Sequence, residues 1–183
     1  MKRVLVIFSS VAIVLAALSS CKKIIAKVFA GTEVNVPDFT VTVPPITITS
    51  STEIPIGSYS FPFNLDSSVR STTAGVFGAN AVNSIRIKQI KIDITNADSL
   101  NNISNFESAR VTLQSSSNNT PVELFSVSFP DSYAASYTFT PTSSPELLSY
   151  AKGSTITYNI FGKIRRITTK SLKMVLSVTL KAD

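Results

Sequence analysis

The sequence predicts an all-β protein, an antiparallel β-sandwich with one or two short helices. The first observation is that apolar and polar residues alternate over most of the chain, the period of half-buried strands. The second is that the stretches between these segments are rich in Ser, Asn, Pro and Gly, which favour turns. The third is that no long helical pattern interrupts them. Together these features favour two antiparallel sheets packed face to face.

Residues 1–20 have the proportions of an export signal. Lys2 and Arg3 form a positively charged start, and an apolar run from Val4 to Leu18 follows, interrupted by two serines. This run is shorter than the roughly 20 apolar residues that a membrane-spanning helix requires. We therefore expect a signal peptide that is cleaved from the mature protein.

The end of this signal resembles a bacterial lipobox. Leu18-Ser-Ser-Cys21 places the one cysteine of the chain directly after small residues. The resemblance implies cleavage before Cys21, a diacylglycerol on its thiol and a third acyl chain, such as palmitate, on its amine. Two or more acyl chains anchor a protein stably, whereas one alone binds marginally. A plain secretory signal or a buried cysteine is the alternative.

The lipobox divides the chain into three parts. We expect a lipoprotein signal peptide at 1–20, a lipidated tether at 21–31 and a single β-sandwich domain at 32–183. Lys22 follows the cysteine, where an Asp would resemble an inner-membrane retention signal, so outer-membrane sorting is expected. The absence of an acidic run after the cysteine favours the periplasmic face of that membrane.

The charge of the mature domain excludes one class of partner. Loss of Lys2 and Arg3 lowers the net charge from +6 to +4. Lys22, Lys23 and Lys27 would lie beside anionic lipid headgroups, and the rest of the chain then carries only +1. No basic patch is interleaved with aromatic residues, so we expect no nucleic-acid partner.

Most of the mature chain reads as strands. Thr32–Val43 alternates with a phase shift at Pro37-Asp38, and Ile46–Thr49 repeats the alternation. Ile54–Phe63 contains two prolines, which lack amide donors, so this strand belongs at a sheet edge. Further strands are predicted at Ala109–Ser115, Val122–Phe129, Ser136–Thr140, Thr155–Lys163 and Ser171–Leu180. The last two form a predicted terminal hairpin whose tip, Arg165-Arg166, is expected to be a solvated turn.

One strand carries a more specific signal. In Ile85–Ile94, Ile85 and Ile87 share one parity, whereas Ile90, Ile92 and Ile94 share the other. One inserted residue reverses which face the following side chains occupy, so this pattern predicts a β-bulge at Lys88-Gln89. All five isoleucines should then face one side.

Helix is scarce in the sequence. The best candidate is Ser144–Gly153, with Ser144 as the N-cap, Pro145 at the first helical position and Gly153 ending the helix. Asp66–Thr73 and Asp98–Asn105 are predicted to form single turns of helix.

Composition and motifs argue against most catalytic sites. The chain has no His and one Cys, which excludes Ser-His-Asp and Cys-His catalysis and ordinary zinc sites; we expect no metal and no cofactor. Ser149-Tyr-Ala-Lys152 matches S-x-x-K but lacks the K-T-G partner, so a surface helix is the better interpretation. Asn96–Asn102 offers oxygens for Ca²⁺ without the order of a specific loop, and such residues also favour turns.

A short motif indicates a modification. Asp98-Ser99-Leu100 resembles the O-glycosylation site of Bacteroidetes, in which an aliphatic residue follows Asp and Ser or Thr. The resemblance implies a glycan on Ser99. Three residues also occur together by chance.

The whole chain resembles small uncharacterised lipoproteins of Bacteroidetes. The residues that carry the resemblance are Val76–Asn80, the bulged strand, Asn96–Asp98, Asn105–Glu107 and Glu146–Tyr150. The family implies the anchor and the β-sandwich, and it implies no catalytic activity.

Two functions remain open. The first is a membrane-anchored, non-enzymatic binding or structural module of the cell envelope, whose partner is an envelope protein or a glycan. The second is a carboxylate-dependent glycoside hydrolase or other envelope hydrolase. A glycosidase needs two carboxyls about 5–9 Å apart. The mature chain has 11 acidic residues, and Asp93 with Glu107 is one pair that could be tested.

Overall fold

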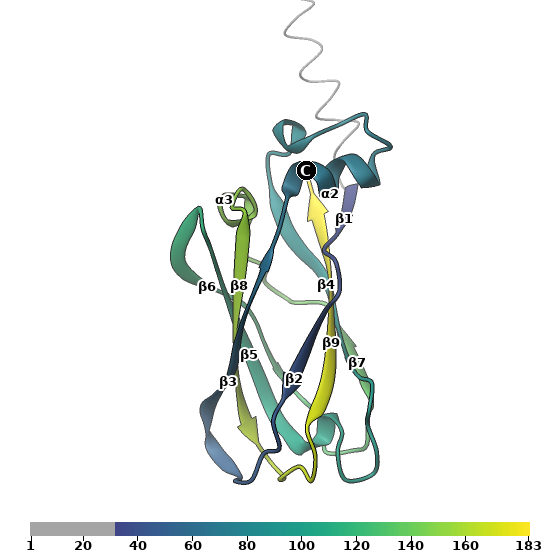
Figure 1. Ribbon diagram of the computed structural model, residues 1–183, viewed down its shortest axis with the longest axis vertical. Coiled ribbons are helices and arrows are strands. Elements are labelled where there is room, and N and C mark those ends of the chain that lie inside the picture. The colour runs from purple at the N-terminus through teal and green to yellow at the C-terminus, as the bar shows by residue number, and fades with distance from the viewer. Residues whose placement is uncertain (1–31) are drawn as a thin grey trace, which may run out of the picture.

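Two antiparallel sheets packed face to face make up the part of the chain that the computed structural model describes, residues 32–183 (Figure 1). The first sheet has the strand order β1-β9-β4-β7, with β2 also pairing with β9, and the second has the order β3-β8-β5-β6. The predicted β-sandwich is therefore confirmed. The strands are β1 (Thr32–Asn35), β2 (Phe39–Val43), β3 (Ser50–Pro62), β4 (Ile85–Ile94), β5 (Phe106–Ser115), β6 (Asn118–Ser128), β7 (Ser136–Phe139), β8 (Thr155–Ile164) and β9 (Leu172–Ala182).

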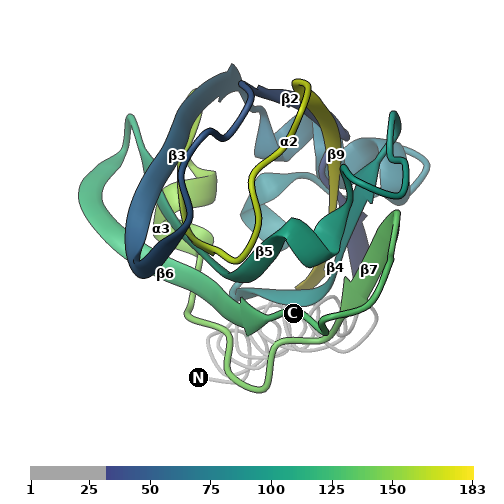
Figure 2. The same ribbon diagram turned by 90° about the horizontal axis from the view of Figure 1, so that it is seen from below.

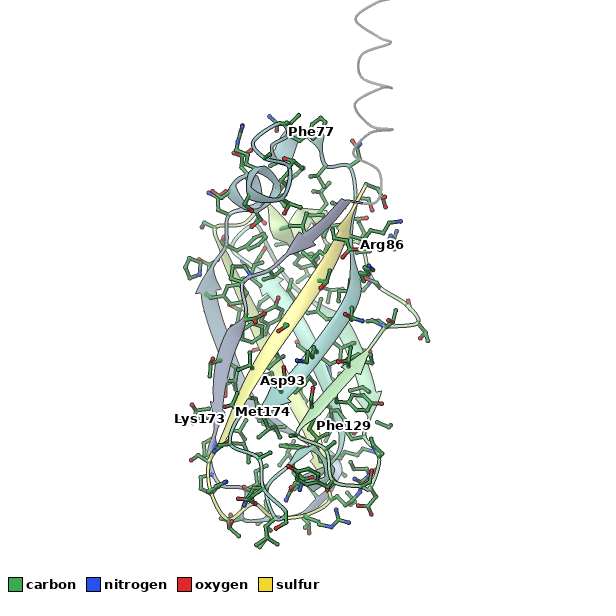
Figure 3. The ribbon with its side chains drawn as sticks, turned by 90° about the vertical axis from the view of Figure 1, so that its right-hand side faces the viewer. Phe77, Arg86, Asp93, Phe129, Lys173 and Met174 are labelled. Carbon is green, nitrogen blue, oxygen red and sulfur yellow. The ribbon has the colours of Figure 1, made fainter. Side chains whose placement is uncertain are left out.

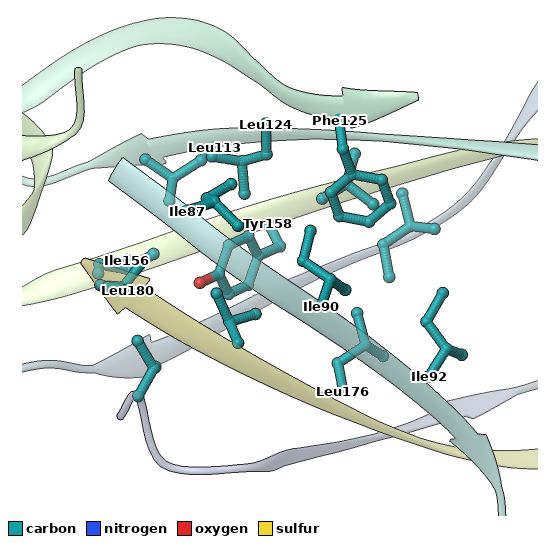
Figure 4. Close-up of a cluster of buried hydrophobic side chains, with 14 of the residues drawn as sticks. Ile87, Ile90, Ile92, Leu113, Leu124, Phe125, Ile156, Tyr158, Leu176 and Leu180 are labelled. Carbon is teal, nitrogen blue, oxygen red and sulfur yellow. The ribbon is translucent and has the colours of Figure 1, made fainter. Parts of the chain in front are cut away.

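The core lies between the two sheets and is built from the alternating apolar residues. Figure 4 shows isoleucines of β4 and leucines of β9 facing side chains of β5, β6 and β8. Tyr158 of β8 is buried and stacks on Phe39 and Phe61, with ring centroids 4.9 and 5.4 Å apart. This aromatic stack closes the core beside β2 and β3, and its apolar surroundings raise the pKa of the Tyr158 hydroxyl.

The predicted bulge in β4 is confirmed. Ile87 pairs with Leu180 of β9, but the next pair is Gln89 with Thr179, so Lys88 is an extra residue on β4. As a result Ile85, Ile87, Ile90, Ile92 and Ile94 are all buried on the same face.

Other edge features also follow from the sequence. The phase shift at Pro37-Asp38 separates β1 from β2, which pair in turn with the two ends of β9. The proline-containing strand β3 is an edge strand that pairs only with β8. Ile46–Thr49, predicted as extended, is not a strand but part of the loop between β2 and β3.

The predicted helix at Ser144–Gly153 is wrong at its start. The helix α3 covers only Leu148–Ala151. Ser144 Oγ instead accepts a hydrogen bond from the Ile87 amide (2.6 Å), and Glu146 Oε1 accepts one from the Ile85 amide (2.8 Å). These side chains cover the part of the β4 edge that β7 does not reach. Hydrogen bonds to the otherwise unpaired β4 amides stabilise the fold more than capping a short helix would.

The other short helices agree better with the sequence. The helix α2 spans Leu65–Thr72 and begins at Asn64, whose side chain accepts a hydrogen bond from the Ser67 amide. Two 3₁₀ turns, η1 (Ala79–Ala81) and η2 (Ile103–Asn105), complete the helical elements of the described part. No helix among residues 32–183 is long and apolar enough to cross a membrane.

The predicted terminal hairpin is wrong. Strand β8 belongs to the second sheet and β9 to the first, so the 165–171 loop crosses from one sheet to the other. Local alternation predicts both strands but not which strand each one pairs with.

The antiparallel topology sorts the loops to the two ends of the sandwich. The loops after β2, β4, β6 and β8 gather at the lower end of Figure 1, and Figure 2 views that end directly. Thr32 lies at the other end, where it pairs with Ala182 near the C-terminus. We call the lower end, formed by residues 44–49, 95–105, 129–135 and 165–171, the distal loop surface.

Candidate functional site

The distal loop surface is organised around three buried asparagines in the 95–105 loop. Asn101, Asn102 and Asn105 are each at most 2% exposed. Asn102 Oδ1 accepts a hydrogen bond from the Ser104 amide (3.0 Å), and Asn105 Oδ1 accepts one from the Asn102 amide (2.8 Å). These reciprocal bonds form a capping box that holds the η2 turn.

The same asparagines join this loop to the 165–171 loop. Asn105 Nδ2 donates to the carbonyls of Leu100 (2.9 Å) and Ile167 (2.7 Å). Asn101 Oδ1 accepts a hydrogen bond from the Thr169 amide at 2.8 Å. Because buried amides and carbonyls need partners, these bonds fix the conformation of both loops.

The two remaining loops are fastened in the same way. Ile46 of the 44–49 loop and Thr168 exchange two hydrogen bonds of 2.8 and 2.9 Å, one of them through the Thr168 hydroxyl. The Ile103 amide donates to the Ala134 carbonyl of the 129–135 loop at 2.9 Å. All four distal loops are thus connected by hydrogen bonds that involve backbone groups.

Arg165 and Arg166 reinforce these connections, although the Arg166 side chain stays half exposed, as expected for a solvated turn. Arg165 donates to the carbonyls of Phe106 (3.0 Å) and Phe129 (3.1 Å), and Arg166 donates to that of Ser104 (3.1 Å). Both guanidinium groups also pair with Asp131. The sequence signal that could have indicated this role is the adjacency of two arginines, whose five donors each suit several carbonyls.

Four large apolar side chains project from this fixed framework into solvent. Ile48 (62% exposed), Leu100 (65%), Tyr133 (60%) and Ile167 (51%) each come from a different distal loop. The hydrogen bonds described above hold the backbone of Leu100 and Ile167, so their exposure is built into the fold. The sequence prediction missed this group because its members lie far apart in the chain.

Val76 provides an internal comparison. It is the one other large apolar side chain exposed in the described part of the chain, at 72%. It lies in the α2–η1 connection next to Phe77, which Figure 3 shows at the end opposite to Phe129 and Lys173.

The oxygens that the sequence offered to Ca²⁺ take part in loop contacts. Asp98 Oδ1 accepts hydrogen bonds from the Leu100 amide (2.9 Å) and Asn101 Nδ2 (2.8 Å), and Oδ2 pairs with Lys170 (2.6 Å). The bond from Lys170, followed by that from Asn101, lowers the pKa of the Asp98 carboxyl to about 2. Within residues 32–183 no three Asp, Glu, His or Cys side chains gather as a metal site would require.

The acidic pair weighed for hydrolysis is not brought together. Asp93 lies on β4 of the first sheet and pairs with Lys91 at 2.8 Å, which lowers the pKa of its carboxyl. Glu107 lies on β5 of the second sheet and approaches Lys163 at 4.0 Å. Each carboxylate thus faces a cation rather than a second acid, unlike the paired carboxyls of a glycosidase.

Two surface hollows lie away from the distal loops. One of about 370 Å³ lies between β6 and residues 141–145 and contains Glu123 as its single acidic residue. The other, of about 270 Å³, lies between α2 and the segment after α3, with Asp66 as its acid. Ser149, the other catalytic candidate, contacts Asn118 Nδ2 through its hydroxyl at 3.3 Å. None of these arrangements is that of an activated nucleophile or an acid–base pair.

Comparison with known proteins supports no assignment beyond the fold. Neither a family model nor a curated protein matches this sequence. A family 32 carbohydrate-binding module from Clostridium perfringens NanJ, solved with galactose, is 10% identical with a TM-score of 0.38, covering 80% of this chain and 98% of that one. The BFDV capsid protein is 13% identical with a TM-score of 0.33, covering 82% and 97%. Scores this low carry no argument about function.

Proposed function

We propose that the mature protein is a lipid-anchored, non-enzymatic binding module of the cell envelope that makes its contact through the distal loop surface. The observation that carries the proposal is a framework of four hydrogen-bonded loops that holds four apolar side chains in solvent. This framework lies at the end of the domain opposite to Thr32, where the tether joins.

The anchor is the part of the proposal that rests on sequence alone. Cys21 and the signal peptide lie outside the described residues. A tether of 11 residues, 21–31, reaches at most about 36–40 Å when extended. The Thr32 end of the domain would therefore lie within about 40 Å of the outer membrane, and the distal loop surface would face away from it.

The exposure of the four apolar side chains favours binding. Transfer of a Leu or Ile side chain from water to an apolar environment is worth about 1.5–3 kcal/mol. Four large apolar side chains exposed at one end of a domain are more than the scattered single exposures of an ordinary surface, and rigidly held loops are where binding residues concentrate. Here the loops are fixed beforehand, so a partner would meet an ordered surface at a small entropic cost.

The hydrolase alternative receives no support from a specific observation. The two surface hollows each contain one acidic residue. On the face of the second sheet, Glu53 is paired with Arg110 (2.6 Å). A general acid with a raised pKa would be needed for glycoside hydrolysis, yet the pKa of the Glu53 carboxyl is lowered by Arg110.

Photo-crosslinking in the native host tests the binding surface. We expect benzoyl-phenylalanine at position 100 or 167 of the full chain to give a discrete cross-linked product, whether protein, glycan or lipid. The same group at position 76 is the matched control, because Val76 is also exposed but lies at the other end of the domain. Absence of products from both distal positions, or the same product from position 76, would contradict the proposal.

Ser99 is proposed to carry an O-linked glycan. Ser99 is exposed in the 95–105 loop, so its hydroxyl can be reached by a modifying enzyme. The carboxylate of the preceding Asp98 accepts a hydrogen bond from the Leu100 amide and so fixes the backbone around Ser99. We expect the protein from its native host to be heavier than its amino-acid sequence and lipid together, and Ser99→Ala to remove that excess. Intact mass spectrometry of both proteins decides the point, and equal excess masses would exclude Ser99 as the attachment residue.

A further inference from the structure

We infer that the distal loop surface binds an anionic phospholipid bilayer. The inference rests on the proposed function, because it names the partner of the same surface. Two properties of the surface carry it: the chemistry of the four exposed apolar side chains and the net positive charge of the loops that hold them.

The apolar side chains fit a lipid interface better than a protein or sugar site. Three of the four, Ile48, Leu100 and Ile167, are aliphatic, and they project separately from different loops. Protein hot spots are instead enriched in Trp, Tyr and Arg clustered in a pocket, and the chain has no Trp. Sugar sites depend on aromatic platforms, for which Tyr133 alone is available among the four. Tyr133 suits the headgroup level of a bilayer, because its ring is apolar and its hydroxyl polar.

Positive charge accompanies these side chains. The distal loop surface carries three basic residues against two acidic ones, and the rest of residues 32–183 carries nine basic against nine acidic. Asp98 pairs with Lys170, and Asp131 with both arginines, so the end keeps a net positive charge after pairing. Aliphatic side chains bordered by Lys and Arg are the combination with which peripheral proteins bind anionic lipids. The basic residues of the distal loop surface are Arg165, Arg166 and Lys170, and Lys173 follows at the start of β9.

One strand offers a matched pair of charges at the two ends of the domain. Lys173 lies at the start of β9, beside the distal loops, and Lys181 lies at its other end, where it pairs with Arg86 in the sheet register. Both lysines are exposed. If the distal end faces the lipid, reversing the charge of Lys173 should weaken binding, whereas the same change at Lys181 should not.

Vesicle capture by the full lipidated protein tests the inference, and every protein compared also carries Ser99→Ala, because Leu100→Asp would otherwise change the proposed glycan as well. The protein is reconstituted into phosphatidylcholine vesicles and mixed with separate, fluorescent vesicles of phosphatidylcholine and phosphatidylglycerol. We expect capture of these anionic vesicles, weak capture of pure phosphatidylcholine vesicles, and a decrease as salt is raised. The double variant Leu100→Asp with Ile167→Asp should lower capture at least roughly tenfold, because each change removes an apolar side chain worth more than 1.4 kcal/mol. Lys173→Glu should also lower it.

The controls separate the possible failures. Val76→Asp and Lys181→Glu should capture vesicles as the unmodified protein does, and urea unfolding checks that the distal variants fold. Equal capture of neutral and anionic vesicles, or capture unchanged in the distal variants, would overturn the lipid inference. If the protein does not insert into the phosphatidylcholine vesicles, the lipid-anchor proposal is contradicted. Binding by the distal loop surface is then measured by flotation of the protein with the anionic vesicles. If vesicles are not captured but position 100 cross-links to a protein or a glycan, the distal loop surface is still a binding surface, and its partner is that protein or glycan instead of lipid.

Discussion

Replacing Cys21 by serine is expected to remove the lipid anchor and release the mature protein from the membrane fraction. In the lipobox that this segment resembles, the cysteine thiol is the nucleophile that accepts diacylglycerol. A serine hydroxyl does not serve in its place. Because acyl chains supply about 0.8 kcal/mol per buried methylene, losing all of them abolishes stable anchoring. Cell fractionation measures this release, as the share of the protein in the soluble fraction compared with the share in the detergent-extracted membrane fraction.

Mass spectrometry of the N-terminal peptide completes this test. If the signal peptide of the serine variant stays uncleaved, the precursor remains in the membrane, and the peptide mass distinguishes this result from acylation. Ser20→Ala is the matched control, because it keeps a small residue before the thiol and should leave both cleavage and acylation intact. An unmodified Cys21 in the native protein would refute the lipoprotein proposal.

Local features of the sequence predicted the local features of the fold. The bulge in β4 could be predicted because side-chain parity is a property of a single strand, and the shift between Ile87 and Ile90 records the inserted residue. The edge position of β3 could be predicted because Pro55 and Pro62 lack amide donors. Neither inference required knowledge of the partner strand.

Features that depend on tertiary contacts could not be predicted in this way. Ser144 and Glu146 have the pattern of a helix start, but the unpaired β4 amides compete for the same oxygens and win. Strands β8 and β9 have the spacing of a hairpin, but their alternation does not record that they belong to different sheets. Such choices are decided by contacts between residues distant in sequence.

The distal loop surface was missed for the same reason. Ile48, Leu100, Tyr133 and Ile167 each lie in a polar loop, and a single exposed apolar residue is ordinary in a soluble protein. Only the topology shows that the four loops share one end. A signal was present for Leu100, Tyr133 and Ile167, which fall outside the strands predicted from alternation, whereas Ile48 lay in the Ile46–Thr49 segment that was predicted as extended.

The largest effect on stability is expected from Asn105→Ala. The Asn105 side chain is buried, donates to the carbonyls of Leu100 and Ile167, and accepts from the amide of Asn102. The alanine variant leaves the buried Asn102 amide and two partly buried carbonyls without their partner, and each unsatisfied buried group costs about 1–3 kcal/mol. We expect the free energy of unfolding to fall by about 3 kcal/mol or more, measured as a lower urea midpoint.

Asn80→Ala is the control for Asn105→Ala, because Asn80 is an exposed residue of η1 and its loss should change the free energy of unfolding by less than about 0.5 kcal/mol. The variant at Asn105 also tests how the distal loops work. The Asn105→Ala variant keeps all four exposed apolar side chains. If binding requires fixed loops, the variant should capture fewer vesicles even at temperatures where the domain is still folded. A urea midpoint equal to that of the control would show that Asn105 does not hold the distal loops together.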